Sequence, residues 1–169
     1  ITLQPIDNLV DRIWEDQPAP PMQPASAYPI EFAGESHEEK RQCLAQELRD
    51  KGQKAAVITL PDSLCWLLNI RGSDIPRNPV AHGFVILHDD ARVDLFMAPA
   101  KIKGIAAHLG ADIAVHVPET LLDQLVTLTG PICLDKSSTP QAIASALVAA
   151  DIDIAWDKDP CALPKARKN

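Results

Sequence analysis

The chain has 169 residues, of which 46% are hydrophobic and 23% are charged, and its formal net charge at pH 7 is −7. This length is typical of one domain with its own core, and the composition is that of a globular protein. The acidic balance argues against broad binding to nucleic acid or to anionic membranes. No apolar run approaches the roughly 20 residues of a membrane helix. We therefore expect a globular domain with neither kind of partner.

The first 29 residues are predicted to form a helix followed by a strap. Apolar residues recur at helical spacing from Ile6 to Glu15, which predicts a short amphipathic helix docked by Trp14. Prolines are dense from Asp16 to Pro29 and disfavour both helix and central strand. We expect this second segment to run extended over the surface as an ordered strap.

Residues 30–156 are predicted to form the main domain. A capping box of Ser36 and Glu39 begins a helix with an apolar stripe that includes Cys43, and Gly52 ends it. The continuous apolar run Ala55 to Leu60 is typical of a strand buried on both faces. Further strands are expected at 83–88, 92–97, 111–117, 131–134 and 152–156, and further helices at 99–109, 118–128 and 139–150.

Strands that alternate with helices predict an α/β fold, with a mixed, largely parallel sheet flanked by helices. Strands 83–88 and 92–97 are joined by Asp89 and Asp90, which favour a hairpin turn. Residues 157–169 lack apolar periodicity and contain prolines and basic residues, which predicts an exposed connector. Trp66 stands among apolar neighbours and is predicted to be a core residue that does not contact a ligand.

Residues that commonly carry chemistry are scattered. The cysteines Cys43, Cys65, Cys133 and Cys161 form no C-x-x-C pair, so we predict reduced, structural thiols in a cytoplasmic protein. The histidines show no paired spacing with a carboxylate, and nucleophile elbows, phosphate loops and dinucleotide fingerprints are absent from the sequence. We therefore predict no catalytic residue and no metal site within this chain. Residues 1–5 lack the features of a signal peptide and an initiator methionine, so we expect a segment of a longer protein.

The stretch after Trp66 is the candidate site, with Arg71, Gly72, Ser73, Asp74 and Asn78 as its residues. One interpretation is a rigid turn, in which Gly72 permits a positive φ and Asp74 caps local amides. The other is that Arg71 and Asp74 project from the edge of the sheet toward a charged group of a ligand or another domain. Composition does not separate the two.

The stretch "WLLNIRGSDIPRNPV", Trp66 to Val80, resembles the signature of the second domain in three-domain Xaa-Pro aminopeptidases, the aminopeptidase P branch of the pita-bread metallopeptidases. It departs from that signature at Arg77, where relatives often carry an aromatic or another polar residue. The resemblance extends over nearly the whole chain through "NLVDRIW", "FAGESHEEK", "LFMAPAKI" and "DPCALPKARKN".

The resemblance implies a creatinase/aminopeptidase N-terminal-like fold and a non-catalytic middle domain, joined by residues 157–169 to a catalytic domain. That catalytic domain is expected to hold a divalent metal, manganese or zinc, and to act on peptides with proline second. Arg71, Gly72, Ser73, Asp74 and Asn78 would form an accessory wall of the cleft or an interdomain contact. The implied partners are the protein's own N-terminal and catalytic domains and a second copy in a homodimer.

Two alternatives remain open at this stage. A related prolidase or creatinase-like enzyme would carry this kind of domain at its N-terminus, usually without another domain before it. A binding module whose following domain has lost its metal ligands would not be an enzyme. The length of the protein before Ile1 and the sequence after Asn169 would distinguish them.

Overall fold

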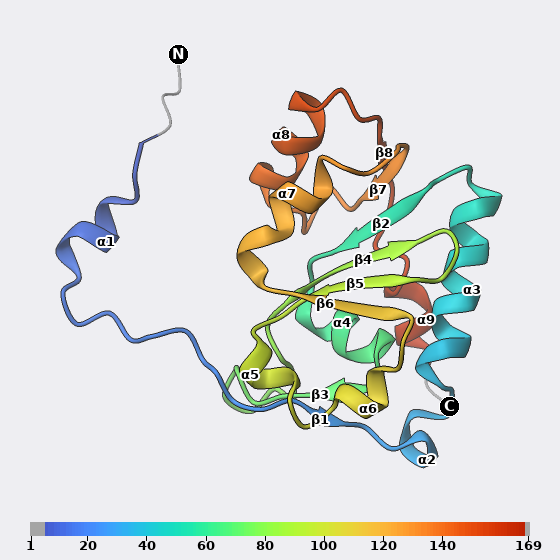
Figure 1. Ribbon diagram of the computed structural model, residues 1–169, viewed down its shortest axis with the longest axis horizontal. Helices are drawn as coiled ribbons and strands as arrows, with labels where there is room; N and C mark the ends of the chain where they lie inside the picture. Colours follow the sequence, from blue (N-terminus) through green and yellow to red (C-terminus); the bar gives the residue numbers. More distant parts are fainter. Residues whose placement is uncertain (1–5, 168–169) are drawn as a thin grey trace.

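The computed structural model describes residues 6–167, and its centre is a six-stranded sheet of order β6-β5-β4-β2-β7-β8 (Figure 1). β4 pairs antiparallel with both β2 and β5, whereas the three remaining neighbour pairs are parallel. The prediction of a mixed, largely parallel sheet is confirmed. Its strands are β2 (Ala55–Ile58), β4 (Phe84–His88), β5 (Val93–Phe96), β6 (Ile113–His116), β7 (Ile132–Leu134) and β8 (Ile154–Trp156).

Helices cover both faces of this sheet (Figure 1). One apolar cluster joins the sheet to α3 (His37–Asp50), α4 (Pro61–Leu67), α5 (Pro99–Ile102) and α6 (Ala106–Leu109), and the other joins it to α7 (Leu121–Leu125) and α8 (Gln141–Ala149). Strand β2 supplies Ala56 and Ile58 to the first cluster, and Ala55 and Val57 to the second. Because side chains of a strand alternate between faces, a continuous apolar run fits this two-sided burial.

Two of the predicted helices are shorter than expected. The range 99–109 is divided into α5 and α6, with Gly104 between them, and the range 118–128 holds a 3₁₀ turn, η1 (Pro118–Thr120), followed by α7. None of the helices within residues 6–167 has the length and apolar content needed to cross a bilayer.

Helix α3 begins and ends where the sequence predicts. The Glu39 amide donates to Ser36 Oγ at 3.1 Å, and the Ser36 amide donates to Glu39 Oε2 at 2.9 Å. Gly52 follows the helix with a φ of 68°, a conformation that glycine adopts without strain. The apolar stripe is narrower than predicted, because Cys43 is exposed while Leu44 is buried.

The N-terminal helix forms but does not dock as predicted. α1 (Leu9–Ile13) contains no buried residue, and Trp14 is 45% exposed. Figure 1 shows α1 standing away from the sheet. The strap joins the domain near its end, where β1 (Ser26–Ala27) pairs antiparallel with β3 (Ile70–Arg71) and leads into α2 (Ile30–Ala33). The apolar face of α1 is thus left without a partner among the described residues.

Candidate functional site

The signature stretch borders a polar hollow with a volume of about 390 Å³. β3 contributes to the hollow, together with the first turn of α3, the end of α4 and the final helix α9 (Ala162–Ala166). Cationic and aromatic side chains share its lining: Tyr28, Phe32, Lys40, Trp66, Arg71, Lys165 and Arg167.

Arg71 is held flat against an aromatic ring in this hollow. Its guanidinium carbon lies 3.9 Å from the centre of the Tyr28 ring, and its Nη1 donates to the Ile70 carbonyl oxygen at 2.9 Å. Tyr28 is fixed in turn, because its amide donates to the Asn69 carbonyl oxygen at 2.7 Å. Stacking on a ring leaves the edge of the guanidinium group able to donate in its plane.

Lys40 is a second cation of the hollow, and sequence reasoning missed it. It is only 3% exposed, and its Nζ donates to Asn69 Oδ1 at 2.6 Å and to the Trp66 carbonyl oxygen at 3.0 Å. Burial lowers the pKa of Lys40, because the charged form loses contact with water. In the sequence Lys40 is one of several charged residues in the first two turns of α3, so no signal separates it from a solvated lysine.

The structure corrects the prediction that Trp66 is a core residue. The residue is only partly buried: it packs against the first apolar cluster on one side and lines the hollow on the other. Lys40 Nζ lies 4.5 Å from the centre of its ring. The apolar neighbours of Trp66 in the sequence are buried, but its own position near the end of α4 faces the rim of the domain.

Asp74 points into the domain, away from Arg71. Its side chain is fully buried, and its Oδ2 accepts from Lys101 Nζ at 2.5 Å and from the His82 amide at 2.6 Å. Arg71 and Asp74 therefore do not form one projecting charged pair. Asp74 fastens the loop after β3 to α5, and Arg71 alone of the two lines the hollow.

Gly72 has a different role from the one predicted. Its φ is not positive; instead, a β-carbon at this position would lie 2.7 Å from the Val80 carbonyl oxygen and from Ala81 Cβ. The loop folds back on itself so closely that only a residue without a side chain fits. Glycine is required here by the close approach of two backbone segments.

Ser73 and Asn78 lie on the exposed part of the same loop. The Asn78 amide donates to the Ile75 carbonyl oxygen at 3.1 Å and closes a tight turn. Arg77, the residue that departs from the signature, has a φ of 65° within this turn, which is uncommon for a residue with a β-carbon. An accessory role for Ser73 and Asn78 stays a prediction.

The C-terminal segment is partly buried, whereas the sequence predicted an exposed connector. Asp159 and Cys161 are buried, and the Asp159 carboxylate accepts from Ser63 Oγ at 2.5 Å and from the Cys161 amide at 2.8 Å. Lys165 Nζ then pairs with Asp62 Oδ2 at 2.5 Å. These contacts fix α9 against the start of α4 and place Lys165 and Arg167 at the hollow. Residues 168–169 of the predicted connector lie outside the described residues.

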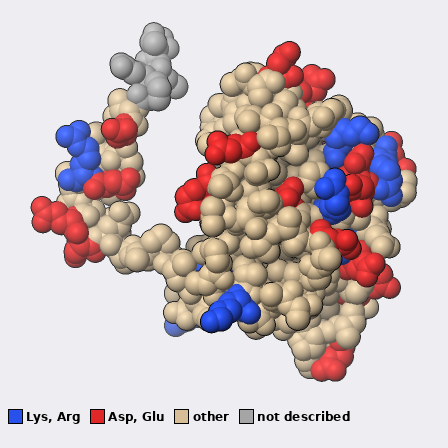
Figure 2. Space-filling model, viewed as in Figure 1, with Lys and Arg blue, Asp and Glu red and all other residues tan. Residues whose placement is uncertain are grey.

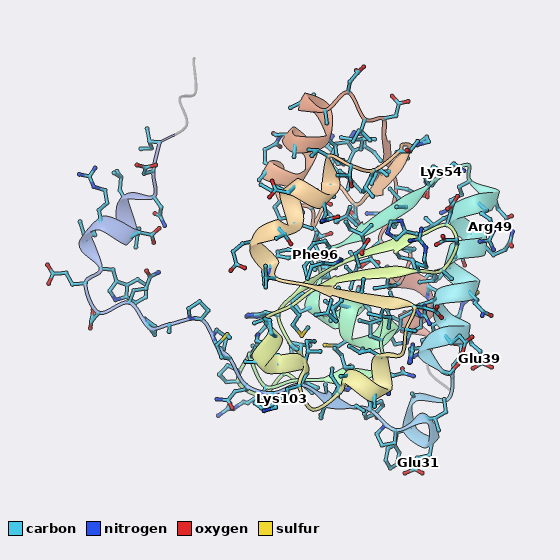
Figure 3. The ribbon with its side chains drawn as sticks, viewed as in Figure 1. Glu31, Glu39, Arg49, Lys54, Phe96 and Lys103 are labelled. Carbon is cyan, nitrogen blue, oxygen red and sulfur yellow. The ribbon has the colours of Figure 1, made fainter. Side chains whose placement is uncertain are left out.

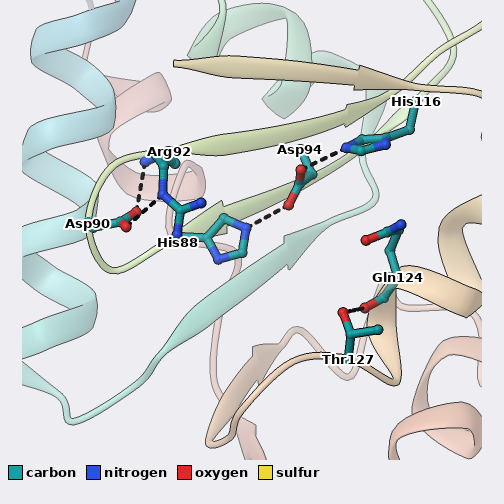
Figure 4. A network of polar contacts seen from close by, with 7 residues as sticks. All are labelled: His88, Asp90, Arg92, Asp94, His116, Gln124 and Thr127. Atoms are coloured by element: carbon teal, nitrogen blue, oxygen red, sulfur yellow. Dashed lines mark hydrogen bonds and ion pairs between the residues drawn. The ribbon is translucent and has the colours of Figure 1, made fainter. Parts of the chain in front are cut away.

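A second polar cluster lies on the sheet (Figure 4). Asp94 on β5 bridges two histidines, with Oδ2 2.7 Å from His88 Nε2 and Oδ1 2.7 Å from His116 Nε2. Sequence analysis found no paired spacing of a histidine with a carboxylate, because His88 and His116 meet Asp94 only when β4, β5 and β6 pair. The hydrogen bond with His88, followed by that with His116, holds the pKa of Asp94 below its ordinary value.

Asp94→Asn is expected to lower the free energy of unfolding by about 1–2 kcal/mol at pH 7, the usual contribution of hydrogen bonds to a partly buried charge. Because the pKa of Asp94 is lower in the folded chain, its contribution is complete above the unfolded value of 3.8. It is then lost as the pH falls through the folded value. Urea unfolding of both proteins at pH 7 and pH 3 measures this difference. A deficit that stays constant between the two pH values would contradict the assignment, and the exposed Asp123→Asn is the control.

The described residues do not fit a metal site. Within residues 6–167 no group of three or more His, Cys, Asp or Glu side chains is arranged to hold a metal ion. The four cysteines are free, and burial raises the pKa of Cys133 to about 12 and also raises the pKa values of Cys65 and Cys161. Thiols that stay protonated are poor ligands and poor nucleophiles.

Comparison with known proteins decides the family. The profile described as "Creatinase/Prolidase N-terminal domain" matches residues 16–169. The chain belongs to the creatinase/prolidase N-terminal domain family. Among curated proteins this family member is 41% identical over 126 residues to a "Probable Xaa-Pro aminopeptidase P" of Coccidioides posadasii, covering 73% of the chain and 20% of that protein. It is 36% identical over 124 residues to the protein of the same name in Leptosphaeria maculans, again covering 73% of the chain and 20% of the relative.

Among solved structures, this creatinase/prolidase N-terminal domain is similar to the X-prolyl aminopeptidase of Caenorhabditis elegans, with a TM-score of 0.86 and 28% identity over 96% of the chain and 28% of that enzyme. That enzyme is described as cytosolic, with a di-nuclear active site. An Xaa-Pro dipeptidase of Bacillus anthracis gives a TM-score of 0.60 at 15% identity, covering 79% of the chain and 37% of that protein, and shows the fold alone. The chain spans about one fifth of the length of the curated relatives named above.

Proposed function

We propose that the chain is the middle, non-catalytic domain of a cytoplasmic, metal-dependent Xaa-Pro aminopeptidase, which removes the N-terminal residue that precedes proline. In this proposal residues 1–29 reach toward the preceding domain, residues 30–156 form the creatinase/aminopeptidase N-terminal-like unit, and residues 157–169 lead into the catalytic domain. The similarity to the C. elegans enzyme, in both fold and sequence, supports the aminopeptidase over the dipeptidase alternative, for which only the fold is similar.

The observation that carries the proposal is the position of Arg71. Its guanidinium is oriented by Tyr28 in a hollow that also contains Lys165 and Arg167 of α9. Because α9 is fixed to α4 through Asp159, the chain beyond it would leave the domain beside this hollow. A following catalytic domain would therefore lie close to Arg71, which is then placed to contact that domain or the bound peptide.

The divalent metal of the parent, manganese or zinc, would be held by residues outside this chain. Residues 6–167 contain no group of three or more His, Cys, Asp or Glu side chains that could hold it. The domain's contribution in this proposal is to position Arg71 and the wall around it.

Helix α1 supports the existence of neighbouring domains. Leu9 and Ile13 of α1 and Trp14, which follows the helix, are exposed. A cluster of exposed apolar side chains on one short element is typical of a surface covered by another protein part. We propose that α1 packs on the preceding domain, or on a second copy in a homodimer.

The test is the kinetics of Arg71→Ala in the full-length enzyme. We expect kcat/KM for an Arg-Pro-Pro peptide to fall about ten- to hundredfold, the loss for one charged contact worth about 1.5–3 kcal/mol. The melting temperature should change little, because the Arg71 side chain makes its main contacts at the surface of the domain. Arg71→Lys should recover part of the rate, since it keeps the charge but not the planar fork.

The control variant is Lys103→Ala, which removes an exposed charge beyond α5 (Figure 3). It should leave both quantities unchanged. The isolated chain, incubated with the same peptide and manganese, should release no amino acid above the buffer blank. An Arg71→Ala enzyme with normal kcat/KM and a lowered melting temperature would favour a purely structural role for Arg71.

A further inference from the structure

The hollow concentrates positive charge in an otherwise acidic protein. The chain has 23 acidic and 16 basic residues, yet four of the basic side chains line this one hollow: Lys40, Arg71, Lys165 and Arg167. Only Lys165 takes part in an ion pair within the described part of the chain, with Asp62. By contrast, cations and carboxylates are interspersed over the end of α3 and the β4–β5 hairpin on the face seen in Figure 2, where Lys54 pairs with Asp89 and Arg92 with Asp90.

Lys40 is the cation whose position most needs a counter-charge. Its ammonium group is buried, and its two hydrogen bonds go to neutral oxygens of Trp66 and Asn69. Glu35 is near enough to stabilise the charged form but makes no ion pair with it among residues 6–167. A buried charge is normally paired, because neutral partners replace only part of the hydration that it loses. An anion in the hollow would supply the missing partner.

The guanidinium group of Arg71 is already oriented in the hollow. The guanidinium of Arg71 is stacked on Tyr28 and uses one nitrogen for the Ile70 carbonyl oxygen. The remaining donors form a planar fork, whose geometry matches the two oxygens of a carboxylate. A side chain fixed before binding loses little conformational freedom when the ligand arrives.

We propose that this hollow is a carboxylate-binding site in which Arg71 and Lys40 bind the anion. The aromatic rings of Tyr28, Phe32 and Trp66 form the wall that packs against the residue carrying the carboxylate. The rings favour an organic anion over a small inorganic one, because they offer apolar contact beside the charges. The carboxylate is supplied either by the C-terminus of a peptide or by an Asp or Glu side chain. Neither source depends on the proposed peptidase function.

The test is a titration of the 169-residue chain, labelled with ¹⁵N and followed by NMR at low salt. The probes are three blocked peptides: acetyl-Ala-Pro-Ala with a free C-terminus, acetyl-Ala-Glu-Ala-amide, and acetyl-Ala-Pro-Ala-amide, which has no carboxylate. The signals are the Trp66 indole N–H and the Arg71 Nε–H. We expect saturable shifts of both with at least one carboxylate peptide and none with the third, and the peptide that binds more tightly identifies the source.

Two variants connect the shifts to the named ligands. Arg71→Gln should weaken binding at least tenfold, whereas Lys103→Gln, which removes one positive charge outside the hollow, should change it less than twofold. Lys40→Met should also weaken binding, but the conclusion does not depend on it, since a buried substitution can reduce folding. Arg71 is partly exposed and lines the hollow, so Arg71→Gln is not a substitution in the core and the test does not depend on Lys40→Met.

Four results would overturn the proposal. The first three are an absence of saturable shifts for both carboxylate peptides, equal binding of the third peptide, and equal weakening by Arg71→Gln and Lys103→Gln. Inorganic phosphate that binds as tightly as the peptides would indicate a general anion site and would also reject the carboxylate assignment. The titration uses the chain without any catalytic domain, so these failures would not contradict the proposed aminopeptidase function. Likewise, failure of the kinetic test of Arg71→Ala would not contradict the carboxylate-binding proposal.

Discussion

Replacement of Lys101 by methionine should lower the free energy of unfolding of the chain by about 3–5 kcal/mol, the range for breaking a buried ion pair from one side. Lys101 Nζ lies 2.5 Å from Asp74 Oδ2, and the two side chains are 4% and 0% exposed. Methionine fills a similar volume but leaves the Asp74 carboxylate buried with the His82 amide as its remaining donor. Asp74 Oδ1 already lacks a hydrogen bond among the described contacts, so no second donor compensates.

Urea unfolding at pH 7 measures the effect, and Lys103→Met is the matched control. Lys103 is exposed at the end of the same helix, and its substitution should cost less than about 0.5 kcal/mol. The double variant Lys101→Met, Asp74→Asn should recover part of the loss, because the uncompensated charge is then absent. A single variant that loses less than about 1 kcal/mol would mean that water reaches Asp74 or that the ion pair does not form.

Asp159→Ala is expected to cost about 2–4 kcal/mol and to release α9 from the domain. The substitution leaves Ser63 Oγ and the Cys161 amide without their acceptor in a buried position, and each unsatisfied group costs about 1–3 kcal/mol. Since Lys165 and Arg167 sit on or just after α9, their places at the hollow depend on the same contact. The variant should therefore also weaken carboxylate binding.

Asp157→Ala provides the comparison within the same segment. Asp157 pairs with Lys51 at 2.7 Å on the surface, where an ion pair contributes about 0–1 kcal/mol. Urea unfolding of the two variants, together with limited proteolysis around α9, distinguishes them. Equal stability losses, or an α9 segment that stays protected in Asp159→Ala, would show that this segment is held by other contacts.

Features that depend on residues near one another in the chain were predictable. The capping box of Ser36 and Glu39 involves residues three apart, and the apolar run of β2 carries its own signal of burial on both faces. The β4–β5 hairpin follows from two strands joined by Asp89 and Asp90. Since the hydrogen bonds and burial of these elements are set by local pattern, the α/β fold with a mixed sheet could be predicted from them.

The docking of elements was less predictable, and the errors have a common cause. An amphipathic α1 forms as expected, but its apolar pattern does not indicate which surface packs against it. Among residues 6–167 no surface covers it. Residues 157–167 look polar in sequence, yet Asp159 and Cys161 are buried because Ser63 and the segment's own backbone satisfy the carboxylate. A polar residue can be buried wherever the fold supplies partners, and those partners lie 96 positions away for Asp159 and Ser63.

By itself the sequence determined the class of fold and the resemblance to a family, because strand and helix periodicities and a signature motif are continuous in the chain. Only the tertiary structure decided where the side chains of the signature stretch lie and what they contact. It separates Asp74, paired with Lys101 27 positions away, from Arg71, and it brings Lys40 and α9 to the same hollow. It also joins His88 and His116 through Asp94 across three strands. Charge pairing and burial depend on distances in space, and those distances are fixed only when β-strand pairing and helix packing bring remote segments together.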